Sequence, residues 1–185
     1  RVLVAGNSDP AATVSIAYGG DVFSADGSGQ FHIPAREARD LVVSGPGLLP
    51  TTVSAAAVEA LFSEDGSLVS QLDVTVTPRV LRGSVAEPDG TPVTGAEVRV
   101  GSVTASTDTS GLYELRFVEP GEPIIIASAA HHPPANASYD GQSEYNASLE
   151  PYIASFQVSE ESTGRALEGV SISTGGEQLG ATDAS

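Results

Sequence analysis

The sequence predicts an all-β protein built from small β-sandwich modules in tandem. Three observations lead to this prediction. Short runs of β-branched and aromatic residues recur along the chain, turn-forming residues separate them, and the whole pattern repeats. Among 185 residues there are 20 glycines and 12 prolines, which fall where strands would turn. The best helix candidate is residues 55–62, expected to be only a short helical turn or an extended strand.

The internal repeat has a period of about 75–80 residues, the size of one compact sandwich. Residues 89–98 (DGTPVTGAEV) match 163–172 (TGRALEGVSI), with the glycines aligned. Residues 25–33 parallel 107–115, and 72–78 parallel 145–151. We therefore expect a divergent module over residues 1–78, a second module over 79–151, and the N-terminal strands of a third, partial module over 152–185.

Alternating side chains predict the strands of the second module at residues 80–86, 97–100, 112–117 and 123–129. Tyr113, Leu115 and Phe117 are expected on one, buried face, with Glu114 and Arg116 on the wet face. Val98 and Val100 should face the same core, with Arg99 outward. Residues 124–126 are three isoleucines without alternation, so we expect both of their faces to be covered.

Composition excludes several classes of protein. The chain carries 24 acidic and 8 basic residues, a net charge of −16, and all the basic residues are arginine. Such a chain repels phosphate backbones and anionic lipids, so neither nucleic-acid binding nor membrane insertion is expected. There is no cysteine to form disulfides, and no apolar run approaches the roughly 20 residues that span a bilayer. The chain begins at Arg1, which is expected of a processed product or a fragment.

Four segments in order, 81–85 (LRGSV), 89–98 (DGTPVTGAEV), 107–115 (TDTSGLYEL) and 118–121 (VEPG), resemble the carboxypeptidase regulatory-like family. The resemblance implies seven-stranded, transthyretin-like or Ig-like Greek-key sandwiches. It also implies spacer and accessory modules of surface proteins, adhesins or glycan-active enzymes, with no catalytic residues to transfer. The zinc peptidase domain for which the family is named is absent. The isopeptide bond of related collagen-adhesin modules cannot form without lysine.

Few residues are candidates for metal binding. His131-His132, with Asp140 and Glu144 downstream, is the nearest to a ligand pair, but neighbouring side chains on a strand point to opposite faces. We expect a loop surface there, and a solvent-facing position for His32. Asp26, Asp108 and Asp183 each begin a turn that either binds Ca²⁺ or, as we expect, caps backbone N–H groups. No metal or cofactor is predicted.

Asn136 and Asn146 lie in Asn-X-Ser sequons and are candidate glycosylation sites. No nucleophile elbow, phosphate-binding loop or triad is recognisable, so the chain is not expected to be an enzyme.

The leading functional hypothesis is a structural module array of an extracellular surface, stalk or filament protein, with adhesion as an added role. One alternative is a glycan-binding or accessory region of a secreted hydrolase or peptidase. Another is a fibre subunit that assembles by adding strands between subunits, because a half sandwich leaves an apolar face and a strand edge exposed. The expected partners are other modules of the chain or neighbouring subunits, and surface glycans or proteins.

Overall fold

The computed structural model describes residues 1–5, 13–33, 37–63, 70–127, 132–152, 155–174 and 177–183. The chain divides into two compact units, Arg1–Pro151 and Tyr152–Ser185. The prediction of an all-β protein is confirmed, since the described elements are strands apart from one short helix, α1 (Ala55–Glu59). The Ser54 side chain caps this helix by accepting a hydrogen bond from the backbone N–H of Ala57.

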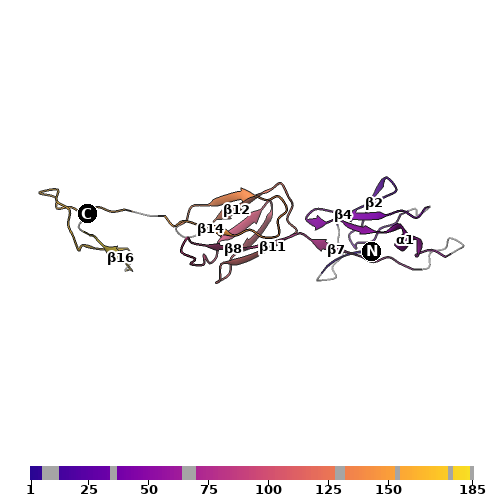
Figure 1. Cartoon of the computed structure of the whole chain (residues 1–185), viewed down its shortest axis with the longest axis horizontal. Coiled ribbons are helices and arrows are strands. Elements are labelled where there is room, and N and C mark those ends of the chain that lie inside the picture. The colour runs from indigo at the N-terminus through magenta and orange to yellow at the C-terminus, as the bar shows by residue number, and fades with distance from the viewer. Residues whose placement is uncertain are drawn as a thin grey trace. The chain divides into compact units, whose positions relative to one another are not determined.

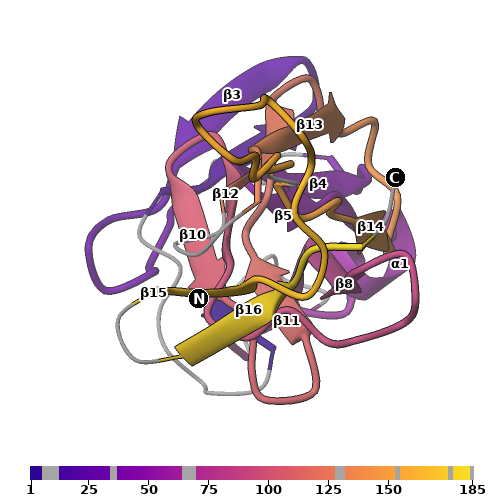
Figure 2. The same ribbon diagram turned by 90° about the vertical axis from the view of Figure 1, so that its left-hand side faces the viewer.

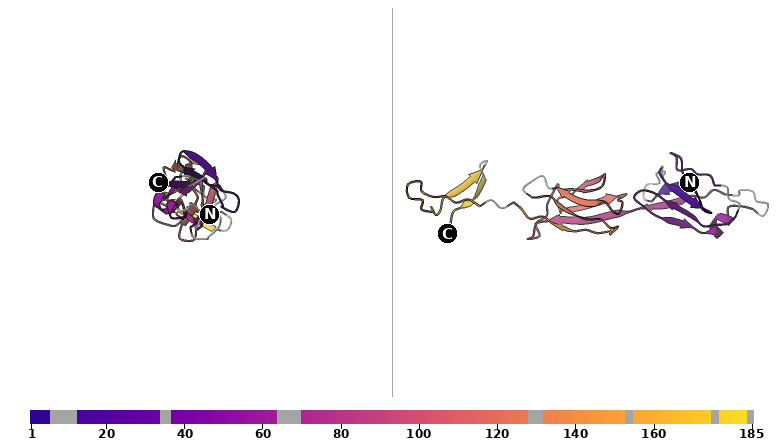
Figure 3. Two further views of the ribbon diagram at one scale, coloured as in Figure 1. Left: turned by 90° about the vertical axis from the view of Figure 1, so that its right-hand side faces the viewer. Right: turned by 90° about the horizontal axis from the view of Figure 1, so that it is seen from above.

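The second half of the first unit is a sandwich of two sheets (Figure 1). Within its described residues the strands are β8 (Val80–Ala86), β9 (Glu97–Val100), β10 (Val103–Ser106), β11 (Leu112–Arg116), β12 (Pro123–Ala127), β13 (Ala135–Ser138) and β14 (Ala147–Ser148). One sheet has the order β10-β9-β12-β13 and the other the order β11-β8-β14. The strands of both sheets can also be followed from above in Figure 3.

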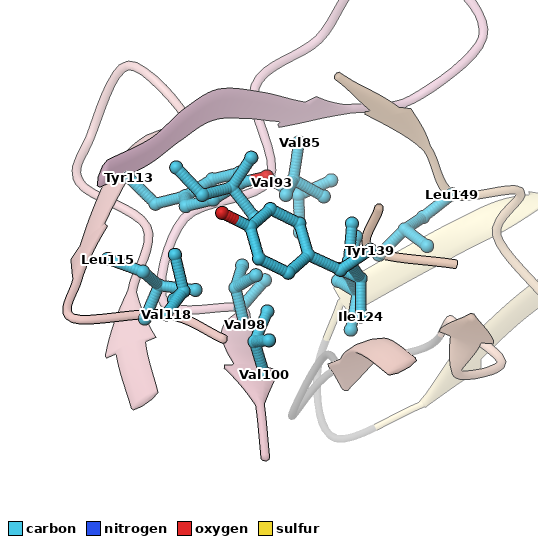
Figure 4. Packing of buried hydrophobic residues seen from close by; sticks show 13 residues of the cluster. Val85, Val93, Val98, Val100, Tyr113, Leu115, Val118, Ile124, Tyr139 and Leu149 are labelled. Carbon is cyan, nitrogen blue, oxygen red and sulfur yellow. The ribbon is translucent and has the colours of Figure 1, made fainter. Parts of the chain in front are cut away.

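Aliphatic side chains from both sheets fill the space between them. Val98, Val100, Ile124 and Ile126 come from the four-stranded sheet and are at most 2% exposed. The other sheet contributes Leu81, Val85, Tyr113, Leu115 and Leu149. Figure 4 shows the ring of Tyr139 in the middle of this cluster, which we call the second core. Burial of alternate residues on each strand therefore holds the two sheets together.

The first half of the unit has its own cluster, the first core, between two further sheets. Its described strands are β1 (Val2–Val4), β2 (Ser15–Tyr18), β3 (Asp21–Ser24), β4 (Leu41–Ser44), β5 (Leu48–Leu49), β6 (Thr51–Val53) and β7 (Val74–Pro78). The sheet orders are β3-β2-β4-β6 and β1-β7-β5. In both halves the first strand lies parallel to the last, β1 with β7 and β8 with β14.

The same hydrogen bonds occur in both halves where the sequence repeats. The Asp26 carboxylate accepts bonds from the N–H groups of Ser28 and Gln30, as Asp108 does from Ser110 and Leu112. Beyond each turn, Val2 N–H donates to Gly29 O at 2.7 Å, and Val85 N–H donates to Gly111 O at 2.8 Å. The two halves are thus variants of one strand arrangement.

Two predicted positions in the second core are wrong. Phe117 does not continue the buried face of β11, because the strand ends at Arg116 and Phe117 adopts a φ of 63°. Its side chain is 40% exposed, and Val118 is buried in its place. On β12, Ile125 is only half-buried between two fully buried isoleucines, so one face of this strand is open rather than covered.

The second unit, Tyr152–Ser185, contains the hairpin of β15 (Ser171–Thr174) and β16 (Glu177–Ala181), seen side by side in Figure 2. An isolated bridge joins Ser159 to Ala166. None of the side chains described in this unit is buried. A two-stranded hairpin cannot enclose a core by itself, and the division into a third, partial module stays a prediction.

Candidate functional site

The two cores of the first unit meet at a small set of residues, Gly47, Arg79, Phe117 and Glu119, which we call the core junction. Strand β7 ends at Pro78 and β8 begins at Val80, so Arg79 is the single residue between them. Its N–H donates to Gly47 O at 2.8 Å, and its carbonyl accepts from Phe117 N–H at 2.8 Å. One residue therefore hydrogen-bonds to a turn of the first sandwich and to a loop of the second.

Gly47 is in contact with the backbone of Phe117. It has a φ of 65°, and a Cβ atom built on it would lie 2.2 Å from Phe117 O and 2.5 Å from Phe117 Cα. Its N–H donates to Glu119 Oε1 at 3.2 Å. No side chain larger than hydrogen fits between the two backbones, so the approach depends on glycine.

Phe117 is the one non-glycine residue of the described chain with a positive φ. This conformation costs an ordinary L-residue about 1–2 kcal/mol. The bond from Phe117 N–H to Arg79 and the contact with Gly47 compensate for that cost. The loop after β11 is thus held in a strained shape where it meets the first sandwich.

Two further contacts support the junction. The Arg116 guanidinium donates a long bond, 3.4 Å, to Ala5 O just after β1. On the other side, burial raises the pKa of Tyr139, and the positive charge of nearby Arg79 opposes that shift to a smaller extent. Arg79 therefore has its backbone in the junction and its charge close to the second core.

Two of the three predicted turn aspartates, Asp26 and Asp108, act as backbone caps. Asp26 Oδ1 accepts bonds from Ser28 N–H, Ser28 Oγ and Gln30 N–H at 2.7–2.9 Å, and these bonds lower its pKa. Asp108 Oδ1 accepts from two backbone N–H groups at 2.8 and 2.9 Å. Within the described residues no group of three or more histidine, aspartate or glutamate side chains could hold a metal ion.

The histidine positions differ from the prediction in part. His131 lies outside the described residues. The His132 side chain is only 9% exposed, with Nε2 at 3.1 Å from Glu87 Oε1, so it is not the surface loop residue we expected. Pairing with Glu87 makes its burial tolerable. His32 is exposed, as predicted, although residues 28–33 form no strand.

The two sequon asparagines have different surroundings. Asn136 is exposed on β13, an edge strand. The Asn146 carboxamide instead accepts bonds from Ser84 N–H and Oγ, and its nitrogen donates to Glu144 Oε1 at 2.8 Å. The acceptor nitrogen of Asn146 is therefore already engaged, and glycosylation of either residue stays a prediction.

A hollow of about 410 Å³ opens beside the first core. Phe31 and Phe62 line it together with Arg1, His32 and Asp73, its titratable groups. Arg1 pairs with Asp73 at 3.6 Å. Two aromatic rings beside polar groups can contact a small ligand, but this set does not include a nucleophile held by a base.

Sequence reasoning did not identify the core junction. Its one sign in the sequence is Gly45-Pro46-Gly47, which predicts a turn but does not predict which residues that turn contacts. Within the described residues, no helix is long and apolar enough to cross a membrane.

No protein-family description and no curated protein matches the chain. Among solved structures it is similar to a cohesin–X-dockerin complex from Acetivibrio cellulolyticus, with 18% identity over 37% of this chain and 51% of that one, at a TM-score of 0.30. The Bacillus anthracis TIE protein matches with 8% identity over 81% of this chain and 33% of that one, at 0.34. A minor pilin of Streptococcus agalactiae matches with 9% identity over 83% and 89%, at 0.32.

The match with this chain spans about half of the chain from the cohesin–X-dockerin complex and about a third of the TIE protein. At such identities and TM-scores these similarities carry no inference about the function of this chain.

Proposed function

We propose that the chain is a non-catalytic structural array of β-sandwich modules from an extracellular surface, stalk or filament protein. The modules are residues 1–78, 79–151 and 152–185, related to carboxypeptidase regulatory-like domains. Their role is to hold a fixed spacing and to present surface to neighbouring subunits or other proteins.

The core junction is the observation that carries this proposal. A flexible tether between two binding domains needs only a polar linker. Here the linker is one residue, Arg79, and both of its backbone groups are hydrogen-bonded, one to each sandwich. Glycine at position 47 lets the loops approach within contact distance. Such a joint resists bending, which is what a spacer requires.

Charge supports a surface location. A net charge of −16 on 185 residues keeps a chain of many strand edges apart from its copies. Asp26 and Asp108 add to this charge and serve as caps, so they stabilise turns and maintain solubility together.

NMR relaxation of the 185-residue chain tests the rigid joint. We expect amides of the first and second cores to report one shared, anisotropic tumbling time. Two separate tumbling times would contradict the spacer role. Labelling of intact cells with an antibody against the second sandwich tests the location, and signal only after lysis would contradict a surface protein.

A glycan-binding accessory role is the second candidate, favoured by the Phe31 and Phe62 side chains at the hollow beside the first core. Sugars stack on aromatic rings, so a glycan array should then give hits that Phe62→Ala abolishes. The variant Phe156→Ala, which lies outside the hollow, is the matched control. An array without hits would leave the spacer role as the sole proposal.

A further inference from the structure

Aspartate followed by glycine is the pair at which a main chain rearranges most readily, because glycine has no side chain to shield its nitrogen. The chain contains four such pairs, Asp26-Gly27, Asp65-Gly66, Asp89-Gly90 and Asp140-Gly141. The second of them lies outside the described residues. The sequence makes the other three equal candidates, so their surroundings decide which of them reacts.

The rearrangement is a cyclisation followed by a hydrolysis. The main-chain nitrogen of the glycine attacks Cγ of the preceding aspartate, an N–Cγ bond forms, and the carboxyl hydroxyl leaves as water with the amide proton. Water then opens the five-membered ring at either carbonyl. One opening restores aspartate, and the other gives isoaspartate, in which the main chain runs through Cγ. The reaction therefore needs a glycine N–H and a carboxyl group that other groups do not hold.

The Asp26 carboxylate is held by several donors. Its Oδ1 accepts hydrogen bonds from Ser28 Oγ, Ser28 N–H and Gln30 N–H at 2.7–2.9 Å. The bond from the Ser28 hydroxyl, followed by the bond from Gln30, lowers the pKa of Asp26 because both stabilise the ionised form. The protonated carboxyl, which supplies the leaving hydroxyl, is therefore scarce at this pair.

Both reacting groups are engaged at Asp89-Gly90. Asp89 Oδ1 accepts a hydrogen bond from Thr91 N–H at 2.9 Å, and this bond lowers the pKa of Asp89. Gly90 N–H, the nitrogen that would attack, donates to Glu87 O at 2.9 Å. Cyclisation at this pair must first break the Gly90 bond.

The turn at Asp140 is capped by a different side chain. Gln142 Oε1 accepts from Asp140 N–H at 2.8 Å, and Gln142 Nε2 donates to Ser138 O at 3.1 Å. Among the described residues, none donates to the Asp140 carboxylate and none accepts from Gly141 N–H. Asp140 and Gly141 are both exposed. The glutamine thus does the capping, and the two groups that react are left to water.

We propose that Asp140-Gly141 is the site at which isoaspartate forms in the folded chain, in preference to Asp26-Gly27 and Asp89-Gly90. The modification is spontaneous and needs only water, since the molecule lost in the first step is regained in the second. It leaves the net charge unchanged and lengthens the main chain by one carbon atom.

The extra atom falls directly after Tyr139. The ring of this residue lies in the middle of the second core, is 1% exposed, and its carbonyl accepts from Gly121 N–H at 2.8 Å (Figure 4). A Cβ atom built on Gly141 would lie 3.8 Å from Arg79 Nη1, so the core junction is close as well. The modified turn is therefore next to the second core and the core junction.

Ageing of the full 185-residue chain in water at neutral pH tests the proposal. Cleavage after arginine places the three pairs in separate peptides, 2–36, 83–99 and 117–165. Enzymatic methylation detects isoaspartate in each peptide, and fragment-ion mass spectrometry locates it. We expect isoaspartate at Asp140 to form at least about fivefold faster than at Asp26 or Asp89, because breaking one hydrogen bond of ordinary net strength costs about that factor.

Denaturant and two variants provide the controls. In denaturant the three rates should become similar, since the hydrogen bonds are then lost. Asp140→Glu keeps the charge but would have to form a six-membered ring, so it should abolish isoaspartate at this position. Asp89→Glu is the matched control and should leave the rate at Asp140 unchanged.

A rate at Asp26 or Asp89 equal to that at Asp140 in the folded chain would overturn the proposal. A preference for Asp140 of the same size in denaturant would also overturn it, because the preference would then come from the neighbouring sequence and not from the fold.

Discussion

Thr107 is the one polar residue buried in the described chain, at 4% exposure, and it is fully hydrogen-bonded. Its hydroxyl links the turn before β9 to the end of β10. A buried hydroxyl in this position replaces a backbone partner that the sharp turn cannot supply. The Thr107 hydroxyl therefore fixes the end of β10 against the turn before β9, at a Thr-Asp pair that recurs in the sequence repeat.

Thr107→Val should destabilise the second core by about 1–3 kcal/mol, because Ala96 N–H and Val93 O lose their partner while the volume is unchanged. Urea unfolding followed by tyrosine fluorescence measures the change. Thr107→Ser retains the hydroxyl and should cost less than half as much. Equal costs for the two variants would show that packing of the methyl group matters and the hydroxyl does not.

Because of Tyr113, the stability of the second core should fall at alkaline pH. Burial raises the pKa of its phenol to about 12, and its hydroxyl donates to Tyr145 O at 2.7 Å. The unfolded phenol titrates near its ordinary value of about 10. The stabilisation is therefore complete below pH about 10 and is lost as the pH rises through about 12.

Phenolate absorbance should accordingly show one tyrosine titrating near pH 12, and Tyr113→Phe should remove that component. Tyr152→Phe, at an exposed position, should leave that component in place. A native chain whose tyrosines all titrate together near pH 10 would contradict this assignment.

At the scale of elements, strands whose side chains alternate could be predicted closely. The predicted strands 80–86 and 97–100 agree with β8 and β9 in their bounds. Strands β10, β13 and β14 were not predicted, since Val103–Ser106, Ala135–Ser138 and Ala147–Ser148 are short and rich in alanine and serine. Such segments become strands because a neighbouring strand offers hydrogen bonds, and local propensity does not show this.

The two sequons also differ in the elements that carry them, and so in the expected glycosylation of their asparagines. In a host that glycosylates asparagine, Asn136 on the exposed edge strand β13 should be modified at higher occupancy than Asn146, whose nitrogen donates to Glu144. Mass spectrometry of glycopeptides measures both occupancies. Glu144→Ala, which releases the Asn146 nitrogen, should raise modification there. Higher occupancy at Asn146 in the unaltered chain would contradict the argument.

At the scale of the whole molecule, the core junction makes two sandwiches into one compact unit. It uses few atoms: three hydrogen bonds between five backbone groups and one carboxylate, and a glycine that permits close approach. Each hydrogen bond contributes about 1 kcal/mol, so the junction is weaker than either core. It is therefore sensitive to a single methyl group.

Gly47→Ala should separate the tumbling times of the two cores, because its Cβ would lie 2.2 Å from Phe117 O at a positive φ. NMR relaxation measures this, and each core should keep its own chemical-shift pattern. Gly121→Ala is the control, since it shares the positive φ but has nothing within 4 Å of its Cβ. A shared tumbling time in Gly47→Ala would show that the junction does not hold the cores together.

The sequence by itself determined the all-β class, the repeat, the turn aspartates and most of the alternating core positions. These depend on local rules, namely side-chain period and turn chemistry, which act within a few residues. Only the tertiary structure decided that Phe117 leaves the core face, that the His132 side chain lies against Glu87, and that Gly47 touches Phe117. The last two are contacts between residues 45 and 70 positions apart, and no local pattern encodes which distant loop a turn will contact.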